Sequence, residues 1–244
     1  MRAGRIVAIV PAFNEAGAIG GVVDAIRAAD PAYDVVVIDD GSSDETGAIA
    51  RSRGAAVVTL PYNVGIGGTV QTGFKYALEH GYETAVRLDG DGQHDPGELG
   101  KLLGPIHRDE ADIVTGSRFI DGSGEYRPPL ARRIGIVWFA RIVSLLIRQQ
   151  VTDTTSGFQA LNRKGIALFA GDYPNDYPEV EAMVLVFKHR LRLVEVPVTM
   201  RGRETGQSSI TFVRSIYYVF KVTLALFMAM VRRYAVPQEE VRHP

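Results

Sequence analysis

Val86-Arg87-Leu88-Asp89-Gly90-Asp91-Gly92-Gln93 joins an apolar strand to a turn with two carboxylates and an amide. In an extended chain residues i and i+2 point to the same side, so Asp89 and Asp91 are expected to converge with the Gln93 amide oxygen behind them. Such carboxylates repel each other unless a cation lies between them, and oxygen ligands suit Mg²⁺ or Mn²⁺ bridged to phosphates. A solvated acidic turn is the alternative. The position at the C-terminal end of a strand, where α/β proteins bind ligands, favours the metal site.

Strand-like apolar runs alternate with helical stretches through the first half of the chain. The predicted strands are residues 6–10, 35–38, 55–60, 84–88 and 112–116. The predicted helices between them are residues 17–29, 44–53, 68–80 and 96–107. This alternation predicts an α/β fold with a mostly parallel, Rossmann-like sheet covered by helices on both faces.

Composition and charge limit the classes of partner. The 244 residues fit one large domain, or a domain with an appendage, and the absence of cysteine excludes disulfides and thiolate catalysis. Residues 1–125 carry a net charge of −9 and residues 126–244 a net charge of +8. A basic, apolar half suggests an anionic substrate or surface. Its cations are interleaved with Leu, Ile, Val and Phe, as in a membrane-surface segment, so no nucleic-acid partner is expected.

Two amphipathic helices are predicted in the basic half. Residues 134–147 form the first, with Arg141 and Arg148 expected on one face. Residues 212–231 form the second, where a stripe contains Arg214, Lys221 and Arg232 at helical spacing. Its uncharged run is too short to span a bilayer, which takes about 20 apolar residues. We expect both helices to lie on a membrane surface. Packing against the sheet is the alternative.

Three further loops follow or precede predicted elements. Residues 10–15 follow the first strand, and residues 39–44 follow the second, where a carboxylate can accept from the imino N–H of uracil or guanine. The glycine-rich residues 63–68 precede a helix, so their backbone N–H groups could meet a phosphate or a ribose, although they match neither a Walker loop nor a dinucleotide fingerprint. Each loop alone fits ordinary capping and turn chemistry. Together with the acidic turn, the loops predict a nucleoside-diphosphate site.

These segments resemble the family 2 glycosyltransferases with the GT-A fold, which bind nucleotide-diphospho-sugars. The motifs are Pro11-Ala12-Phe13-Asn14-Glu15, Val37-Ile38-Asp39-Asp40-Gly41-Ser42-Ser43-Asp44, Asn63-x-Gly65-x-Gly67 and Asp89-Gly90-Asp91-Gly92-Gln93-His94-Asp95-Pro96. Within the family, the chain resembles the dolichyl- or polyprenyl-phosphate mannosyl- and glucosyltransferases. The motifs for this branch are Gly116-Ser117-Arg118-Phe119, Ala131-Arg132-Arg133 and Thr152-Asp153-x-x-Ser156-Gly157-Phe158-Gln159-Ala160.

The resemblance implies a role for each matching residue. The nucleotide would be bound by Pro11, Ala12, Asn14, Glu15, Asp39, Asp40, Gly67, Asp89, Gly90, Arg203 and Ser208, with Asp40 reading the base. Mg²⁺ or Mn²⁺ would be bound by Asp89, Asp91 and Gln93. The catalytic residues would be Asp91, Arg118, Arg132 and Arg133, with the arginines binding the acceptor phosphate and the diphosphate. The family pattern has a lysine after the closing serine, where this chain has Ser209.

The expected organisation follows from these assignments. Residues 1–208 would form the GT-A catalytic domain, with a basic amphipathic insert at 126–150, and residues 209–244 a membrane-surface helix and tail. The protein would be cytoplasmic and peripheral on the inner face of the cell membrane, with a small membrane protein as a further partner.

The expected activity is inverting, metal-dependent transfer of a sugar from a UDP- or GDP-sugar to a polyprenyl phosphate. One alternative is a family 2 enzyme that transfers a sugar to a hydroxyl, with Asp153 or Glu179 as the base. Another is a sugar nucleotidyltransferase, which would need a glycine-rich basic loop where this chain has residues 11–15. A non-catalytic membrane partner is the third, and the intact Asp89, Asp91 and Gln93 argue against it.

Overall fold

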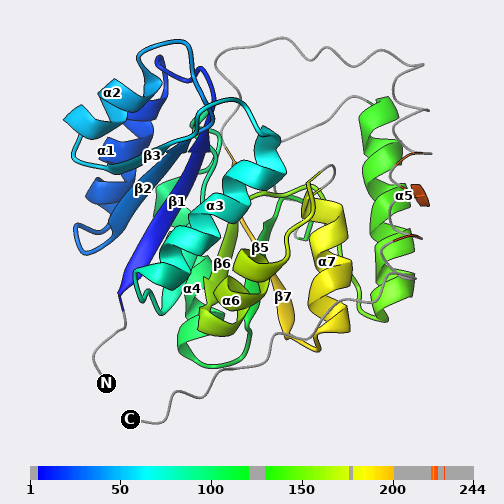
Figure 1. The fold of residues 1–244 in the computed structure, drawn as a ribbon. Coiled ribbons are helices and arrows are strands. Elements are labelled where there is room, and N and C mark those ends of the chain that lie inside the picture. The colour runs from blue at the N-terminus through cyan, green and yellow to red at the C-terminus, as the bar shows by residue number, and fades with distance from the viewer. Residues whose placement is uncertain are drawn as a thin grey trace.

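A single mixed sheet runs through the protein in the order β3-β2-β1-β4-β6-β5-β7 (Figure 1). The structure, a computed structural model, describes residues 5–120, 130–175 and 178–200, together with Lys221, Thr223, Leu224 and Met228. On the helix at 130–147, the structure describes the side chains of residues 135 and 137–147. The strands are β1 (Ile6–Ala12), β2 (Asp34–Asp39), β3 (Ala56–Thr59), β4 (Thr84–Arg87), β5 (Ile113–Ser117), β6 (Gln159–Asn162) and β7 (Leu193–Pro197).

Helices cover both faces of the sheet, which confirms the predicted α/β class. They are α1 (Ile19–Ala29), α2 (Thr46–Ser52), α3 (Gly65–Glu79), α4 (Leu99–His107), α5 (Leu130–Ile147), α6 (Arg163–Gly171) and α7 (Pro178–Lys188), with a 3₁₀ turn η1 (Pro96–Glu98) before α4. One core lies under α3, α5, α6 and α7, and the other lies under α1, α2 and α4 (Figure 1).

The first four strands are parallel, as predicted. β1 is central, pairs with β2 and β4, and is buried along its whole length, which explains its continuous apolar sequence. β1 extends to Ala12, two residues beyond the prediction, because the register with β2 continues through Pro11 and Ala12. The carboxyl ends of β1, β2 and β4 therefore lie side by side.

Strand β6 was not predicted, and it makes the sheet mixed. It runs antiparallel between β4 and β5, with Arg87 opposite Gln159 and Thr115 opposite Gln159. Only four residues long, it is too short for a period-2 pattern to distinguish it from a loop. β7 then pairs parallel to β5 at the edge.

The basic insert forms α5, which packs against α7. Phe139, Val143 and Ile147 enter the core, while Trp138 and Leu145 are 51% and 80% exposed. The predicted helix is therefore present and partly packed on the domain. The prediction that places Arg148 on a face of this helix is wrong, because α5 ends at Ile147 and Arg148 has φ +54°.

The second predicted amphipathic helix is described at four positions, Lys221, Thr223, Leu224 and Met228, all helical. Arg214 and Arg232 lie outside the described residues, as does the predicted domain boundary at 208. Across the described ranges, no helix combines the length and the apolar character needed to cross a bilayer.

Candidate active site

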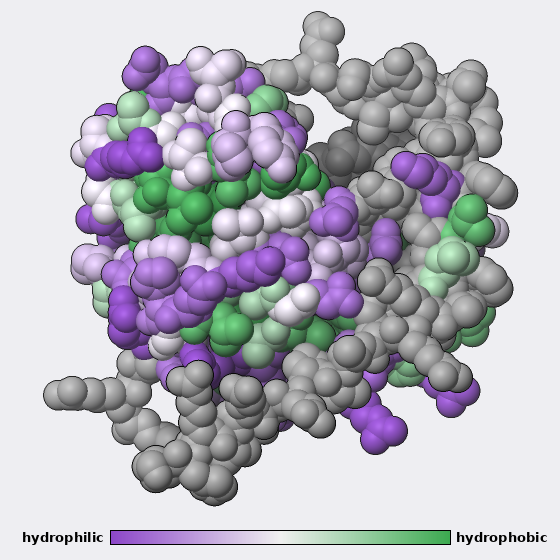
Figure 2. Space-filling model, viewed as in Figure 1, coloured by the Kyte–Doolittle hydropathy of each residue, from purple (hydrophilic) through white to green (hydrophobic). Residues whose placement is uncertain are grey.

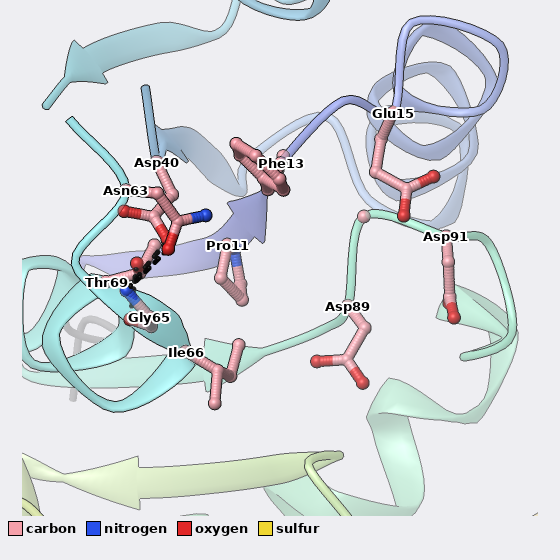
Figure 3. Close-up of a pocket in the computed structure, with 12 residues that line it drawn as sticks. Pro11, Phe13, Glu15, Asp40, Asn63, Gly65, Ile66, Thr69, Asp89 and Asp91 are labelled. Carbon is pink, nitrogen blue, oxygen red and sulfur yellow. Dashed lines mark hydrogen bonds between the residues drawn. The ribbon is translucent and has the colours of Figure 1, made fainter. Parts of the chain in front are cut away.

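A pocket opens where the carboxyl ends of β1, β2 and β4 meet (Figure 3). Its volume is about 290 Å³. It is lined by Pro11, Ala12, Phe13, Glu15, Asp40, Asn63, Gly65, Ile66, Thr69, Asp89, Gly90 and Asp91. Asp40 lies at one end of the pocket and the Asp89–Asp91 turn at the other, with Pro11 and Ile66 between them (Figure 3).

The acidic turn begins two residues after β4 ends at Arg87. Asp89 and Asp91 both line the pocket, and their carboxylates point to the same side of the turn (Figure 3). Asp91 accepts from the backbone N–H of Gln93 at 3.0 Å and from its side-chain amide at 2.7 Å. Both carboxylates thus belong to the pocket lining, and their convergence on one ion stays a prediction, whereas Gln93 buttresses Asp91 and is not among the lining residues. A metal-ligand role for Gln93 stays a prediction.

The donor set of this turn fits a hard divalent cation. The carboxylates of Asp89 and Asp91 both line one cavity. Among the residues that the structure describes, no cluster of three or more His, Asp or Glu side chains could bind a metal ion. Mg²⁺ commonly takes one or two carboxylates and completes its shell with water and substrate phosphates. Asp89 and Asp91 would hold such an ion together with a diphosphate.

Two basic residues, His94 and Arg87, lie beside Asp89. Its backbone N–H donates to Nδ1 of His94 at 3.0 Å, and Nε2 of His94 lies 3.8 Å from Oδ2. Burial opposes ionisation of Asp89, but His94 and then Arg87 outweigh it and lower the pKa of Asp89. Burial lowers the pKa of His94. The turn therefore presents an ionised carboxylate to the pocket at neutral pH.

Asp40 organises the opposite end of the pocket. Its carboxylate accepts from the backbone N–H of Val64 at 2.7 Å and from that of Gly65 at 3.1 Å. For Val64 and Gly65 the prediction that the loop N–H groups are free for a phosphate is therefore wrong, because Asp40 accepts from both; for the rest of residues 63–68 it stays a prediction. Each carboxylate oxygen has two lone pairs, so Asp40 retains acceptor capacity toward a base in the pocket.

Three residues predicted to bind the nucleotide do not line the pocket. Asn14, at φ +55°, accepts from the backbone N–H of Ser43 at 2.9 Å and so joins the loops after β1 and β2. Asp39 accepts from the N–H of Ser42 at 3.1 Å. Gly67 lies so close to the backbone of residues 174–175 that a Cβ would clash with it. Their geometry supports the loops around the pocket, and contact with the nucleotide stays a prediction.

Comparison with known proteins agrees with this geometry. Residues 7–168 match the family model described as Glycosyl transferase family 2. The chain belongs to glycosyltransferase family 2. It is 32% identical to the undecaprenyl-phosphate mannosyltransferase of Micrococcus luteus, over 85% of this chain and 88% of that one. It is 30% identical to the UDP-N-acetylglucosamine–dolichyl-phosphate N-acetylglucosaminyltransferase of Methanococcus voltae, over 93% and 97%. These relatives support the predicted branch of the family.

The fold of this glycosyltransferase is GT-A. Glucosyl-3-phosphoglycerate synthase from Mycobacterium tuberculosis, in complex with Mn²⁺, UDP-glucose and phosphoglyceric acid, superposes with a TM-score of 0.70 at 22% identity. The match covers 96% of this chain and 82% of that one. The likeness confirms the predicted architecture.

The arginines predicted to act in catalysis are only partly described. Arg118 pairs with Asp153 through Nε at 2.7 Å and Nη2 at 2.8 Å, and Nη2 also donates to Thr155 at 2.6 Å. This pair is nearly buried. Arg132 and Arg133 lie on α5 with side chains outside the described part, and Arg203 and Ser208 lie wholly outside it.

Sequence reasoning missed a group of residues behind Asp89. Arg87 is buried on β4, donates to Tyr173 and Glu179, and lies 3.5 Å from Oδ1 of Asp89. Gly157 packs directly over Arg87 and Asp89. The sequence did contain a signal for this group, because Arg87 stands inside an apolar strand where a charged residue is unusual. It precedes Asp89 by two residues, so in an extended chain both side chains point to the same side.

Proposed function

We propose that this glycosyltransferase transfers a sugar from a UDP- or GDP-sugar to a polyprenyl phosphate, with Mg²⁺ or Mn²⁺ and at a membrane surface. The observation that carries the proposal is one pocket with Asp40 at its nucleoside end and the Asp89–Asp91 pair at its diphosphate end. The acceptor class is supported by the undecaprenyl-phosphate and dolichyl-phosphate transferases among the relatives.

The chemistry suits an ionised acceptor. A polyprenyl phosphate already carries negative charge near pH 7, so its attack on the anomeric carbon needs positioning and charge neutralisation, and no strong base. A bound divalent ion would stabilise the leaving nucleoside diphosphate. Asp89 and Asp91 would hold the diphosphate end, and Asp40 would orient the base. Direct displacement by the phosphate oxygen inverts the anomeric centre.

The alternative acceptor, a sugar hydroxyl, needs a carboxylate base. Asp153 is fully buried and both of its oxygens accept from Arg118. Oε1 of Glu179 accepts from the buried Arg87 at 2.8 Å. Both carboxylates already accept from an arginine, so neither is placed to take a proton from an acceptor hydroxyl. This observation favours the phosphate acceptor.

The acceptor phosphate is assigned first to Arg132 and Arg133, since a guanidinium binds phosphate bidentately. Arg118 is engaged with Asp153 and Thr155, so its proposed part is to hold the loop around residues 153–155 beside the site. Arg203 and Ser208 are proposed to close over the donor.

The membrane-surface assignment rests on α5. Val137, Trp138 and Leu145 are exposed large apolar residues on this helix, and Arg141 is exposed among them. In Figure 2, which has the same view as Figure 1, green and purple residues lie together at the right of the molecule, where Figure 1 shows α5. Aromatic and basic side chains on one helix favour the boundary between headgroups and acyl chains. Residence on the inner face of the cell membrane and a small membrane-protein partner are part of the same proposal.

The test is transfer of radiolabelled sugar from UDP- and GDP-sugars to a short polyprenyl phosphate with Mn²⁺, followed by organic extraction. We expect lipid-linked label that disappears with EDTA and with Asp91→Asn, because the variant removes one of the two metal-facing charges. A soluble oligosaccharide acceptor is assayed in parallel. Label on its hydroxyls and none on the lipid would establish the alternative acceptor.

A further inference from the structure

A buried arginine connects the acidic turn to α7. Arg87 is 1% exposed, and its guanidinium donates to the hydroxyl of Tyr173 at 3.1 Å and to Oε1 of Glu179 at 2.8 Å. Its Nε is buried without a hydrogen-bond partner in the described part of the chain. Arginine is rarely buried without full pairing, and such a group costs stability. Its retention beside a carboxylate that faces the pocket points to a role in the site.

The arginine restrains one oxygen of Asp89. Nη2 of Arg87 lies 3.5 Å from Oδ1 of Asp89. That oxygen is buried, although the Asp89 side chain as a whole is 37% exposed. The exposed part of the side chain therefore excludes Oδ1 and leaves Oδ2, which lies 3.8 Å from Nε2 of His94, as the oxygen that can face the pocket. The contact with Arg87 thus favours the rotation of the carboxylate that keeps Oδ1 inward.

Gly157 closes the other side of this pair. A Cβ on Gly157 would lie 2.9 Å from Nη2 of Arg87 and 3.2 Å from Oδ1 of Asp89. Its φ is not in the left-handed region, so the glycine is required by space and not by backbone conformation. The loop that carries Gly157 thus packs directly on the contact between Arg87 and Asp89.

We propose that Arg87 is a positioning residue for metal and diphosphate binding. Held by Tyr173 and Glu179 and covered by Gly157, it orients Asp89 so that Oδ2 would be left for a divalent ion bound with the diphosphate. Partners behind a metal ligand set its orientation in this way, and their loss costs about 10–100-fold in metal affinity. The inference rests on the proposed function in one respect, that the pocket binds a nucleoside diphosphate with a divalent ion.

Two variants disturb the contact by different routes. Arg87→Met with Glu179→Gln removes the cation and neutralises its partner on α7, so that Glu179 is not left as an unpaired charge. Gly157→Ala adds one methyl group that pushes on the flexible end of Arg87 and on Oδ1 of Asp89. Arg192→Met is the matched control. This control removes an arginine that pairs with Asp109 and Asp112. All three residues lie outside the pocket lining.

The measurement is calorimetric binding of UDP and of GDP to the full chain, with Mn²⁺ and with EDTA. Thermal unfolding is followed for each variant. We expect the double variant and Gly157→Ala to lose about tenfold or more in Mn²⁺-dependent affinity while affinity in EDTA is unchanged. Arg192→Met should lower the unfolding temperature and leave Mn²⁺-dependent affinity unchanged.

The outcomes separate this inference from the proposed function. If the unmodified protein shows no Mn²⁺-dependent affinity for either nucleotide, the proposed function is wrong and the inference falls with it. If the unmodified protein shows that affinity and both site variants retain it in full, the inference about Arg87 alone is overturned. The inference would also be overturned if Arg192→Met lost as much Mn²⁺-dependent affinity as the site variants, because the loss would then reflect lower stability of the fold.

Discussion

At the scale of the residue, Asp40 both holds a loop and lines the candidate nucleotide pocket. Its carboxylate accepts from the backbone N–H groups of Val64 and Gly65 and also lines the pocket. The base-reading role that we propose for Asp40 would therefore share one charge with its observed role in holding the loop. Substitution is expected to affect both.

Asp40→Asn should weaken UDP or GDP binding by about 1–3 kcal/mol. The substitution replaces one carboxylate oxygen, which accepts hydrogen bonds, by an amide group that donates, so the loop N–H groups and the imino N–H of the base lose an acceptor. Titration calorimetry of the four nucleoside diphosphates with Mn²⁺ measures this. CDP and ADP, which lack the imino N–H, should bind weakly before and after the change. Equal affinity of the unmodified protein for all four nucleotides would contradict base reading by Asp40.

At the scale of the element, α5 divides its residues between the core and the outer surface. Phe139, Val143 and Ile147 are buried against the domain, while Trp138 and Leu145 face outward. The packing interpretation therefore holds for one face of α5, and the membrane interpretation stays a prediction for the exposed face.

Trp138→Ala with Leu145→Ala should reduce sedimentation with anionic liposomes and leave thermal unfolding nearly unchanged, because both side chains are exposed. Arg141→Glu should weaken binding at low salt by at least about 1 kcal/mol, and added salt should reduce the difference. Lys75→Glu makes the same charge change at an exposed position of α3 and serves as the control. Equal liposome binding by Arg141→Glu and Lys75→Glu would argue against a membrane-facing α5.

Phe139→Ala tests the packed face of the same helix. Phe139 is 2% exposed, so its truncation leaves a cavity between α5 and the domain and should cost about 3–5 kcal/mol of unfolding free energy. Chemical denaturation measures the change. A cost below about 1 kcal/mol would mean that α5 is not part of the cooperative core.

At the scale of the whole molecule, Asp112 joins three strands beyond the first half of the sheet. It accepts from the Asn162 side chain at 2.8 Å and from the Arg192 backbone N–H and Nε at 2.9 and 3.1 Å. Burial alone would raise the pKa of Asp112, but the bonds from Arg192 and Asn162 lower it to about 2 from an ordinary value of 3.8. The folded state thus favours the ionised form.

A carboxyl group whose pKa is lower in the folded state than in the unfolded state stabilises the fold at pH values above its unfolded pKa. This contribution is lost as the pH falls toward the folded-state pKa. We expect Asp112 to contribute about 2 kcal/mol above pH 4, lost between about pH 4 and 2. Asp112→Asn should be less stable at pH 7 and show a shallower loss of unfolding free energy below pH 4. Parallel pH profiles for the two proteins would contradict this assignment.

The sequence by itself determined the alternation of elements, the parallel first half of the sheet and the acidic turn at the pocket. Those features depend on periodicity and on turn residues, which are local. The carboxyl ends of adjacent parallel strands then meet at one edge. For that reason residues 10–15, 39–44 and 89–91 could be assigned to one site before their contacts were known.

Only the tertiary structure decided the partners of those residues. Capture of the Val64 and Gly65 N–H groups by Asp40 joins two loops, and the contact of Gly67 with residues 174–175 joins segments more than a hundred positions apart. Insertion of β6 between β4 and β5 places Gln159 opposite Arg87, and packing of α7 supplies Glu179 to the same arginine. Such pairings are set by which elements become neighbours in the fold, and no local pattern in the chain encodes that choice.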